Sequence, residues 1–268
     1  MVRITYALTC RPGEDPVAKA QDVALEQTAE LPAPAVPPDV DVVGTVETVE
    51  PAGDGRWRAV IAYRAEVVGG DLLQLLNVLF GNISMKSGIQ VTDLELPPDL
   101  LARFPGPAYG IGGLRALTGV SRRPIVCTAI KPLGLDARRL ADLAYQFARG
   151  GMDIVKDDHG LADQPSAPFA ERVARCQEAV ARANAETGGR TLYFPNVTAG
   201  PAEFLARAER ARTLGCRGVL LSPMLTGLGG LGDLARDSRL ALLAHPTLAG
   251  AFFHSDHGVR PEVLLGRV

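Results

Sequence analysis

The first hundred residues alternate between the two spacings of apolar positions that distinguish strands from helices. Residues 2–10 alternate apolar and polar positions and are rich in β-branched side chains, which indicates a strand. Residues 15–28 open with Asp-Pro and then place apolar residues at helical spacing. The predicted order is strand, helix, strand, strand, helix, strand over residues 2–10, 15–28, 40–50, 56–68, 71–81 and 89–96. That order is typical of the ferredoxin-like, split βαβ arrangement.

After residue 123 the pattern changes to apolar strands that alternate with amphipathic helices. The predicted strands are residues 125–131, 152–156, 191–197, 216–223 and 240–245. Regular alternation of this kind predicts a parallel sheet. A complete (β/α)8 TIM barrel needs about 250 residues, so residues 124–268 hold only about five of its βα units. We therefore expect an α/β protein with a ferredoxin-like α+β domain at 1–100, a linker at 101–123 and a partial TIM barrel at 124–268. The partial barrel is either an open five-unit sheet or the N-terminal part of a longer barrel, and we expect the latter.

Polar residues gather where the predicted strands of this second part end. They are Lys131, then Lys156 to His159, then Asn196 and Thr198, then Ser222 and Thr226, then His245. The carboxyl ends of barrel strands form the catalytic face of (β/α)8 enzymes. The sequence therefore predicts an active site at this edge.

Composition narrows the classes of partner. The chain is 47% apolar and 22% charged, with a formal net charge of −2, which is typical of a soluble globular protein. This balance gives no electrostatic reason to expect nucleic acid or an anionic membrane as a partner. The start of the sequence lacks a basic flank followed by a long apolar segment, and no stretch reaches the roughly 20 apolar residues of a membrane span. We expect a cytoplasmic protein without a membrane segment.

The two lysines that close neighbouring strands suggest a specific chemistry. A protonated amine is a poor metal ligand, but a lysine that reacts with CO2 becomes a carbamate, an anionic oxygen donor comparable to a carboxylate. With Asp158 beside it, a carbamate on Lys156 would form a hard-oxygen site suited to Mg2+. A Schiff-base aldolase that uses Lys131 or Lys156 is an alternative, against which the adjacent carboxylates argue.

In these residues the chain resembles the large subunit of ribulose-bisphosphate carboxylase/oxygenase (RuBisCO) and, more closely, the RuBisCO-like proteins (form IV) of the same family. The matching motifs are Lys131-Pro132 with Gly134-Leu135, Gly150-Gly151-x-Asp153 leading to Lys156-Asp157-Asp158-His159 and Gln164-Pro165, and Gly81-Asn82. The resemblance implies a homodimer whose active site lies between one subunit's barrel and the other's N-terminal domain.

The resemblance also implies a role for each matching residue. Lys131 and Lys156 would be catalytic, and Lys156 as a carbamate would hold Mg2+ with Asp158 and His159. Substrate-binding positions would be Asn82, Glu26 and His245. Several departures separate the chain from the carboxylases: His159 replaces a glutamate, Leu133 a lysine, Ala129 a threonine and Pro246 an arginine.

These departures favour a RuBisCO-like enzyme over a carboxylase. The expected reaction is Mg2+-assisted enolisation and proton transfer on a phosphorylated ketose. The enzyme would be an enolase or isomerase of the 5-methylthioribulose-phosphate type in methionine salvage, or a lyase that decarboxylates a sugar-acid phosphate. A genuine ribulose-bisphosphate carboxylase is one alternative. A truncated, non-catalytic homologue that serves as a folded dimeric partner is another.

Overall fold

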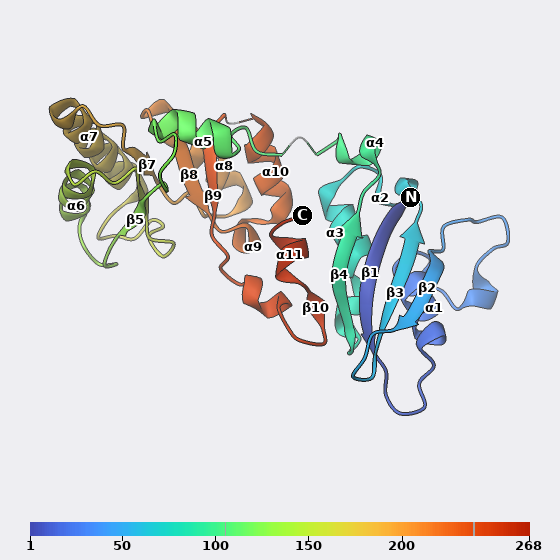
Figure 1. Ribbon diagram of the computed structural model, residues 1–268. Coiled ribbons are helices and arrows are strands. Elements are labelled where there is room, and N and C mark those ends of the chain that lie inside the picture. The colour runs from blue at the N-terminus through green and yellow to red at the C-terminus, as the bar shows by residue number, and fades with distance from the viewer. Residues whose placement is uncertain (105, 238) are drawn as a thin grey trace. The chain divides into compact units, whose positions relative to one another are not determined.

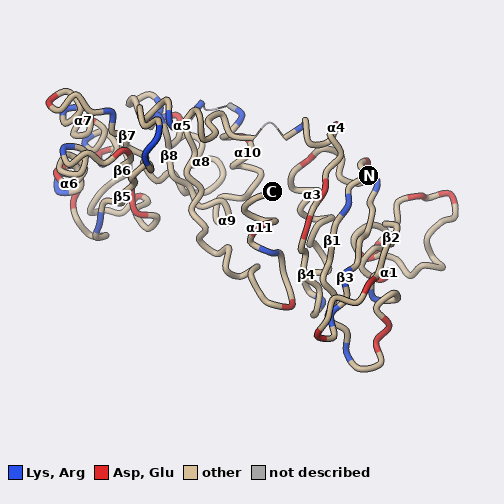
Figure 2. Tube along the Cα trace, viewed as in Figure 1, with Lys and Arg blue, Asp and Glu red and all other residues tan. Residues whose placement is uncertain are grey.

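The computed structural model describes residues 1–104, 106–237 and 239–268 (Figure 1). The chain forms two compact units, Met1–Pro105 with Leu248–Val268 (unit 1) and Gly106–Thr247 (unit 2). Within the described ranges, no helix is both long and apolar enough to cross a membrane. Figure 2 shows residues of both charge signs interspersed along each unit, in keeping with the small net charge.

Unit 1 is built on a five-stranded sheet with the order β10-β4-β1-β3-β2. Its strands are β1 Val2–Thr9, β2 Thr45–Pro51, β3 Arg56–Tyr63, β4 Ile89–Glu95 and β10 Gly258–Val259. The helical segments are α1 Pro16–Glu26, η1 Ala33–Ala35, α2 Ala65–Val68, α3 Leu72–Phe80, η2 Asn82–Met85, α4 Pro98–Leu101, η3 Ala249–Phe252 and α11 Pro261–Leu264. The central strand β1 pairs antiparallel with both β3 and β4. The predicted ferredoxin-like arrangement is confirmed.

The alternation in β1 explains the core of unit 1. Val2, Ile4, Tyr6 and Leu8 are fully buried, while the residues between them are more exposed. Successive side chains of a strand point to opposite faces, so one face of β1 faces the core. The helix α1 begins at Pro16 because the Asp15 carboxylate accepts a hydrogen bond from the Val17 N–H at 3.0 Å.

Unit 2 has the five predicted parallel strands. They are β5 Cys127–Ile130, β6 Ile154–Asp157, β7 Leu192–Phe194, β8 Gly218–Leu221 and β9 Ala241–Ala244. The first three pair in the order β5-β6-β7 and the last two pair with each other, and a bridge between Asn196 and Leu220 links the two groups. The helices are α5 Ile111–Thr118, α6 Ala137–Arg149, α7 Phe169–Thr187, α8 Pro201–Thr213, α9 Pro223–Thr226 and α10 Leu228–Asp237. This is the partial barrel that the alternation predicts.

The compact units divide the chain differently from the domain ranges that we expect from the sequence. The segment assigned to the linker, 101–123, contains α5, which packs within unit 2 through Leu114 and Leu117. The last residues, 248–268, group with unit 1 instead of with residues 124–247. The reason is backbone pairing: β10 runs parallel to β4, with Val259 opposite Val91, and Val263 is buried beside it.

Candidate active site

Lys131 and Asp158 meet at the ends of two neighbouring parallel strands. In the register of β5 and β6, Ile130 lies opposite Asp157, so the residues that follow them emerge side by side. The Lys131 Nζ is 2.9 Å from the Asp158 Oδ2. Lys131 keeps 63% of its side chain exposed, whereas Asp158 keeps 15%. The ammonium is therefore held over the strand ends while it remains open to a ligand.

The environment of Asp158 keeps its carboxylate ionised. Burial raises the pKa of Asp158, but the hydrogen bond from the Gly160 N–H and the Lys131 ammonium together lower it on balance. An ionised carboxylate is the form that binds a cation.

Lys156 lies on β6, one residue before the fully buried Asp157. Its ammonium donates a hydrogen bond to the Asp157 carbonyl at 3.1 Å. The residue is half-buried. Lys131, Lys156 and Asp158 are thus brought to one edge, as the sequence predicts.

His159 and His245 complete this cluster. The two imidazole rings are stacked, with centroids 4.1 Å apart and planes inclined by 11°. The His159 Nδ1 is 3.4 Å from the Asp158 Oδ1, and the His245 Nδ1 is 2.7 Å from the Thr247 Oγ1. Burial, followed by the charges of His159 and Lys156, lowers the pKa of His245. His245 is therefore neutral at pH 7.

The other two predicted site residues, Glu26 and Asn82, lie together in unit 1. The Asn82 Nδ2 donates to the Glu26 Oε1 at 3.4 Å, and the Glu26 Oε2 accepts a 2.7 Å hydrogen bond from Lys86. Glu26 ends α1 and Asn82 begins η2, so the contact joins two elements that are 56 residues apart. The structure places the candidate residues in two groups, one in each compact unit.

Gly81 and Gln27 determine the conformation of the loop that carries Asn82. A Cβ on Gly81 would lie 2.4 Å from the Asn77 carbonyl oxygen, so a side chain at this position would force the loop away from α3. The buried Gln27 accepts a hydrogen bond from the Ile83 N–H and donates to the carbonyls of Asn77 and Val78. The glycine in the predicted Gly81-Asn82 motif therefore has a packing role.

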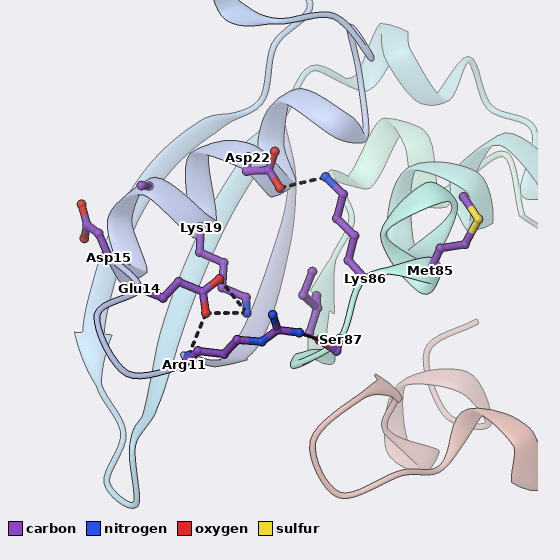
Figure 3. A pocket seen from close by; sticks show the side chains of 10 residues that line it. Arg11, Glu14, Asp15, Lys19, Asp22, Met85, Lys86 and Ser87 are labelled. Atoms are coloured by element: carbon purple, nitrogen blue, oxygen red, sulfur yellow. Dashed lines mark hydrogen bonds and ion pairs between the residues drawn. The ribbon is translucent and has the colours of Figure 1, made fainter.

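A surface pocket of unit 1 lies next to this group (Figure 3). It is lined by residues of α1, of the segment before it, and of the stretch from the end of η2 to the start of β4: Arg11, Glu14, Asp15, Ala18, Lys19, Asp22, Met85, Lys86, Ser87 and Ile89. Lys86 pairs with Asp22 at 2.8 Å, and Lys19 pairs with Glu14 at 3.3 Å. Because these charges compensate one another, the pocket lacks the concentrated positive charge that a phosphate group requires.

One residue that contacts the site edge escapes the sequence analysis. Arg172 is fully buried in α7 and forms an ion pair with Asp157. A charged residue in a helix is normally read as solvent-exposed. Its position in the helical repeat does indicate burial, however, because Arg172 lies on the same face of α7 as the buried Phe169, Val173 and Cys176.

Comparisons with known proteins show the family of the chain. The family model for the ribulose bisphosphate carboxylase large chain, catalytic domain, matches residues 110–267. The chain is 38% identical to the RuBisCO-like protein of Rhodopseudomonas palustris and superimposes on its crystal structure with a TM-score of 0.91, over 99% of this chain and 73% of that one. The chain belongs to the RuBisCO large-chain family, in its RuBisCO-like branch.

Two curated relatives of the RuBisCO-like branch have named reactions. The chain is 41% identical to a 5-methylthioribulose-1-phosphate isomerase of Rhodospirillum rubrum, over 87% of this chain and 64% of the relative. It is 33% identical to a 2,3-diketo-5-methylthiopentyl-1-phosphate enolase of Bacillus pumilus, over 98% of this chain and 68% of the relative. The chain thus spans about two thirds of the length of these relatives.

Proposed function

We propose that this RuBisCO-like protein enolises a phosphorylated ketose of the 5-methylthioribulose type, as an isomerase or an enolase. The observation that supports this most directly is the Lys131–Asp158 pair, which lies beside Lys156 and the stacked histidines at the strand ends. Enolisation removes a proton from a carbon next to a carbonyl and leaves negative charge on oxygen. The site offers groups for both tasks.

The donor set fits Mg2+ only if Lys156 is carbamylated. Among the described residues, no three His, Cys, Asp and Glu side chains are grouped so that they could hold a metal ion. Asp158 supplies one anionic oxygen and His159 an imidazole nitrogen, so the missing hard donor has to come from Lys156. A neutral Lys156 amine that adds to CO2 gives a carbamate and releases one proton. We propose that Lys156, Asp158 and His159 hold Mg2+, which when bound would polarise the substrate carbonyl.

The remaining roles follow from position. The exposed Lys131 ammonium, held by Asp158, is placed to donate a hydrogen bond to the oxygen that gains charge. The neutral imidazole of His245 is available to bind a phosphate group of the substrate or to transfer a proton. Asn82 and Glu26 are proposed to bind substrate, and the protein is proposed to be a homodimer that shares its sites.

Two alternatives are less well supported. A Schiff-base aldolase needs a lysine amine that is free to attack a carbonyl, but the Lys131 Nζ is engaged by the Asp158 carboxylate at 2.9 Å. A carboxylase is disfavoured by the departures at Leu133, His159 and Pro246, and the curated relatives named above are an isomerase and an enolase.

The experiment that tests the proposal follows solvent exchange. The protein is incubated in D2O with Mg2+, bicarbonate and 5-methylthioribulose 1-phosphate. Proton NMR then records loss of the signal of the proton on the carbon next to the ketone. We expect exchange in the wild type and its loss in Lys156→Ala. Arg212→Met, which removes an exposed ion pair with Glu209 on α8, is the matched control and retains exchange. Exchange that is absent in the wild type, or equal in Lys156→Ala, contradicts the proposal.

A further inference from the structure

A fully buried ion pair lies directly behind the candidate site. The Arg172 Nε is 3.1 Å from the Asp157 Oδ2, and neither side chain has any solvent-exposed surface. Asp157 falls between Lys156 and Asp158 in the sequence. Because strand side chains alternate, Asp157 points to the helix-covered face of β6, opposite to Lys156.

The guanidinium of Arg172 makes two further contacts with the segment that follows β6. Its Nη1 donates to the Ala167 carbonyl at 2.8 Å, and its Nη2 donates to the Ala162 carbonyl at 2.9 Å. One planar group thus joins the end of β6 to two points of the 158–167 loop. Arginine suits this task because its five N–H donors are fixed in one plane.

Residues of β7 and of the segment after it hold the same loop from the other side. The buried Asn196 donates through its Nδ2 to the carbonyls of His159 and Leu161, and its backbone N–H donates to the Asp157 Oδ2. Tyr193 donates to the other oxygen of Asp157 at 2.6 Å. Four carbonyls of the segment between His159 and Ala167 are therefore held by two side chains, Arg172 and Asn196.

Stability alone gives a weak reason for such an arrangement. Taking two charges out of water carries a desolvation penalty that the attraction between them often fails to exceed. The network does define the conformation of the loop, since the hydrogen bonds of Arg172 and Asn196 fix its carbonyls in orientation as well as in distance. The Asp158 and His159 side chains project from that loop, next to Lys156 on the strand.

We infer that Arg172 is a positioning residue, which acts through Asp157 and the carbonyls of Ala162 and Ala167 to hold Lys156, Asp158 and His159 in one constellation. The effect of Arg172 on catalysis rests on the function proposed above. Its effect on the conformation of the loop does not, so the inference about Arg172 and the proposed function can fail separately.

The test compares Arg172→Lys with the wild type. Lysine keeps the positive charge opposite Asp157 but has no planar fork with which to reach both carbonyls. We expect amide hydrogen exchange in residues 158–167 to rise at least tenfold, while exchange in α6 and α8 stays at the wild-type level. With labelled bicarbonate and Mg2+, the carbon-13 carbamate signal of Lys156 should fall at least fivefold.

Two further variants keep the inference falsifiable. Tyr193→Phe removes one hydrogen bond to Asp157 with little change in volume, and it serves if Arg172→Lys does not fold; we expect a two- to fivefold rise in exchange confined to residues 158–167. Tyr145→Phe removes a tyrosine–carboxylate hydrogen bond elsewhere in unit 2, the exposed one to Glu186, and should leave this loop unchanged. Unchanged loop exchange, or a rise spread evenly over unit 2, overturns the inference. A wild type without a carbamate signal contradicts the proposed function and leaves the exchange measurements to decide the role of Arg172.

Discussion

His159 and His245 stack face to face at 4.1 Å, although they follow two strands that lie far apart in the sequence, β6 and β9. Two cationic rings at this separation would repel each other, so the stack is compatible with at most one charge. The lowered pKa of His245 supplies the neutral partner. The other ring, His159, contacts Asp158. It occupies the position where the resemblance places a glutamate in the carboxylases.

This arrangement predicts the effect of restoring the carboxylate. His159→Glu adds an anionic oxygen beside Asp158, and hard cations prefer such donors to imidazole. We expect the Mg2+ dissociation constant, measured by calorimetric titration in bicarbonate, to fall about tenfold, which corresponds to about 1.4 kcal/mol. His254→Glu makes the same change at an exposed position in unit 1 and should leave the constant unchanged. Equal affinities in His159→Glu and the wild type would show that this position does not bind the metal.

Removing the Lys131 ammonium should affect catalysis far more than folding. Lys131 is mostly exposed, and exposed ion pairs contribute about 0–1 kcal/mol to stability. Lys131→Met is therefore expected to unfold within a few degrees of the wild type in a thermal melt. Its rate of deuterium exchange into the ketose should fall by about 10²–10³, the usual effect of removing one hydrogen-bond donor to an oxygen that gains negative charge. A variant that melts normally and exchanges at the wild-type rate would remove Lys131 from the catalytic residues.

The sequence predicts that Lys131 and Asp158 lie together, because the information that places them is local. Alternating apolar positions define β5 and β6, and parallel pairing then brings the residues after them, Lys131 and Asp158, together. The stack of His159 on His245 joins the ends of β6 and β9, two strands that do not pair with each other, so no spacing in the sequence predicts it. The two-residue strand β10 is too short to show a periodicity, so its pairing with β4 could not be predicted either.

The Asp153 of the predicted Gly-Gly-x-Asp motif has a structural role that gives a pH dependence. Its carboxylate accepts two hydrogen bonds from Arg123, at 2.6 and 2.7 Å, and one from the Val126 N–H. The hydrogen bonds from Arg123 lower the pKa of Asp153, against the opposing effect of burial. A carboxylate with a lowered folded-state pKa contributes stability above its ordinary value of about 3.9, and this contribution is lost as the pH falls below that value.

Asp153→Asn should therefore be less stable than the wild type at pH 7, by about 1.5–3 kcal/mol, because hydrogen bonds to a charged group are lost. The difference should shrink as the pH falls below about 4, where the wild type also loses the charge. Urea denaturation at a series of pH values measures both effects. Asp142→Asn, on the exposed side of α6 in the same unit, is the control and should follow the wild type. A difference that stays constant from pH 7 to pH 3 would exclude the Arg123 pair as its source.

The close approach of Gly81 to Asn77 predicts the outcome of adding a single methyl group. In Gly81→Ala the new Cβ would lie 2.4 Å from the Asn77 carbonyl, a contact that requires the loop to move away from the end of α3. Asn82 would move with the loop, away from Glu26. We therefore expect KM for the phosphorylated ketose to rise about tenfold. The value of kcat should change less, because Lys131 and Asp158 lie in the other unit. Gly250→Ala, also in unit 1, places a Cβ where no atom lies within 4 Å and should behave as the wild type. A Gly81→Ala enzyme with unchanged KM would show that the position of Asn82 does not matter for substrate binding.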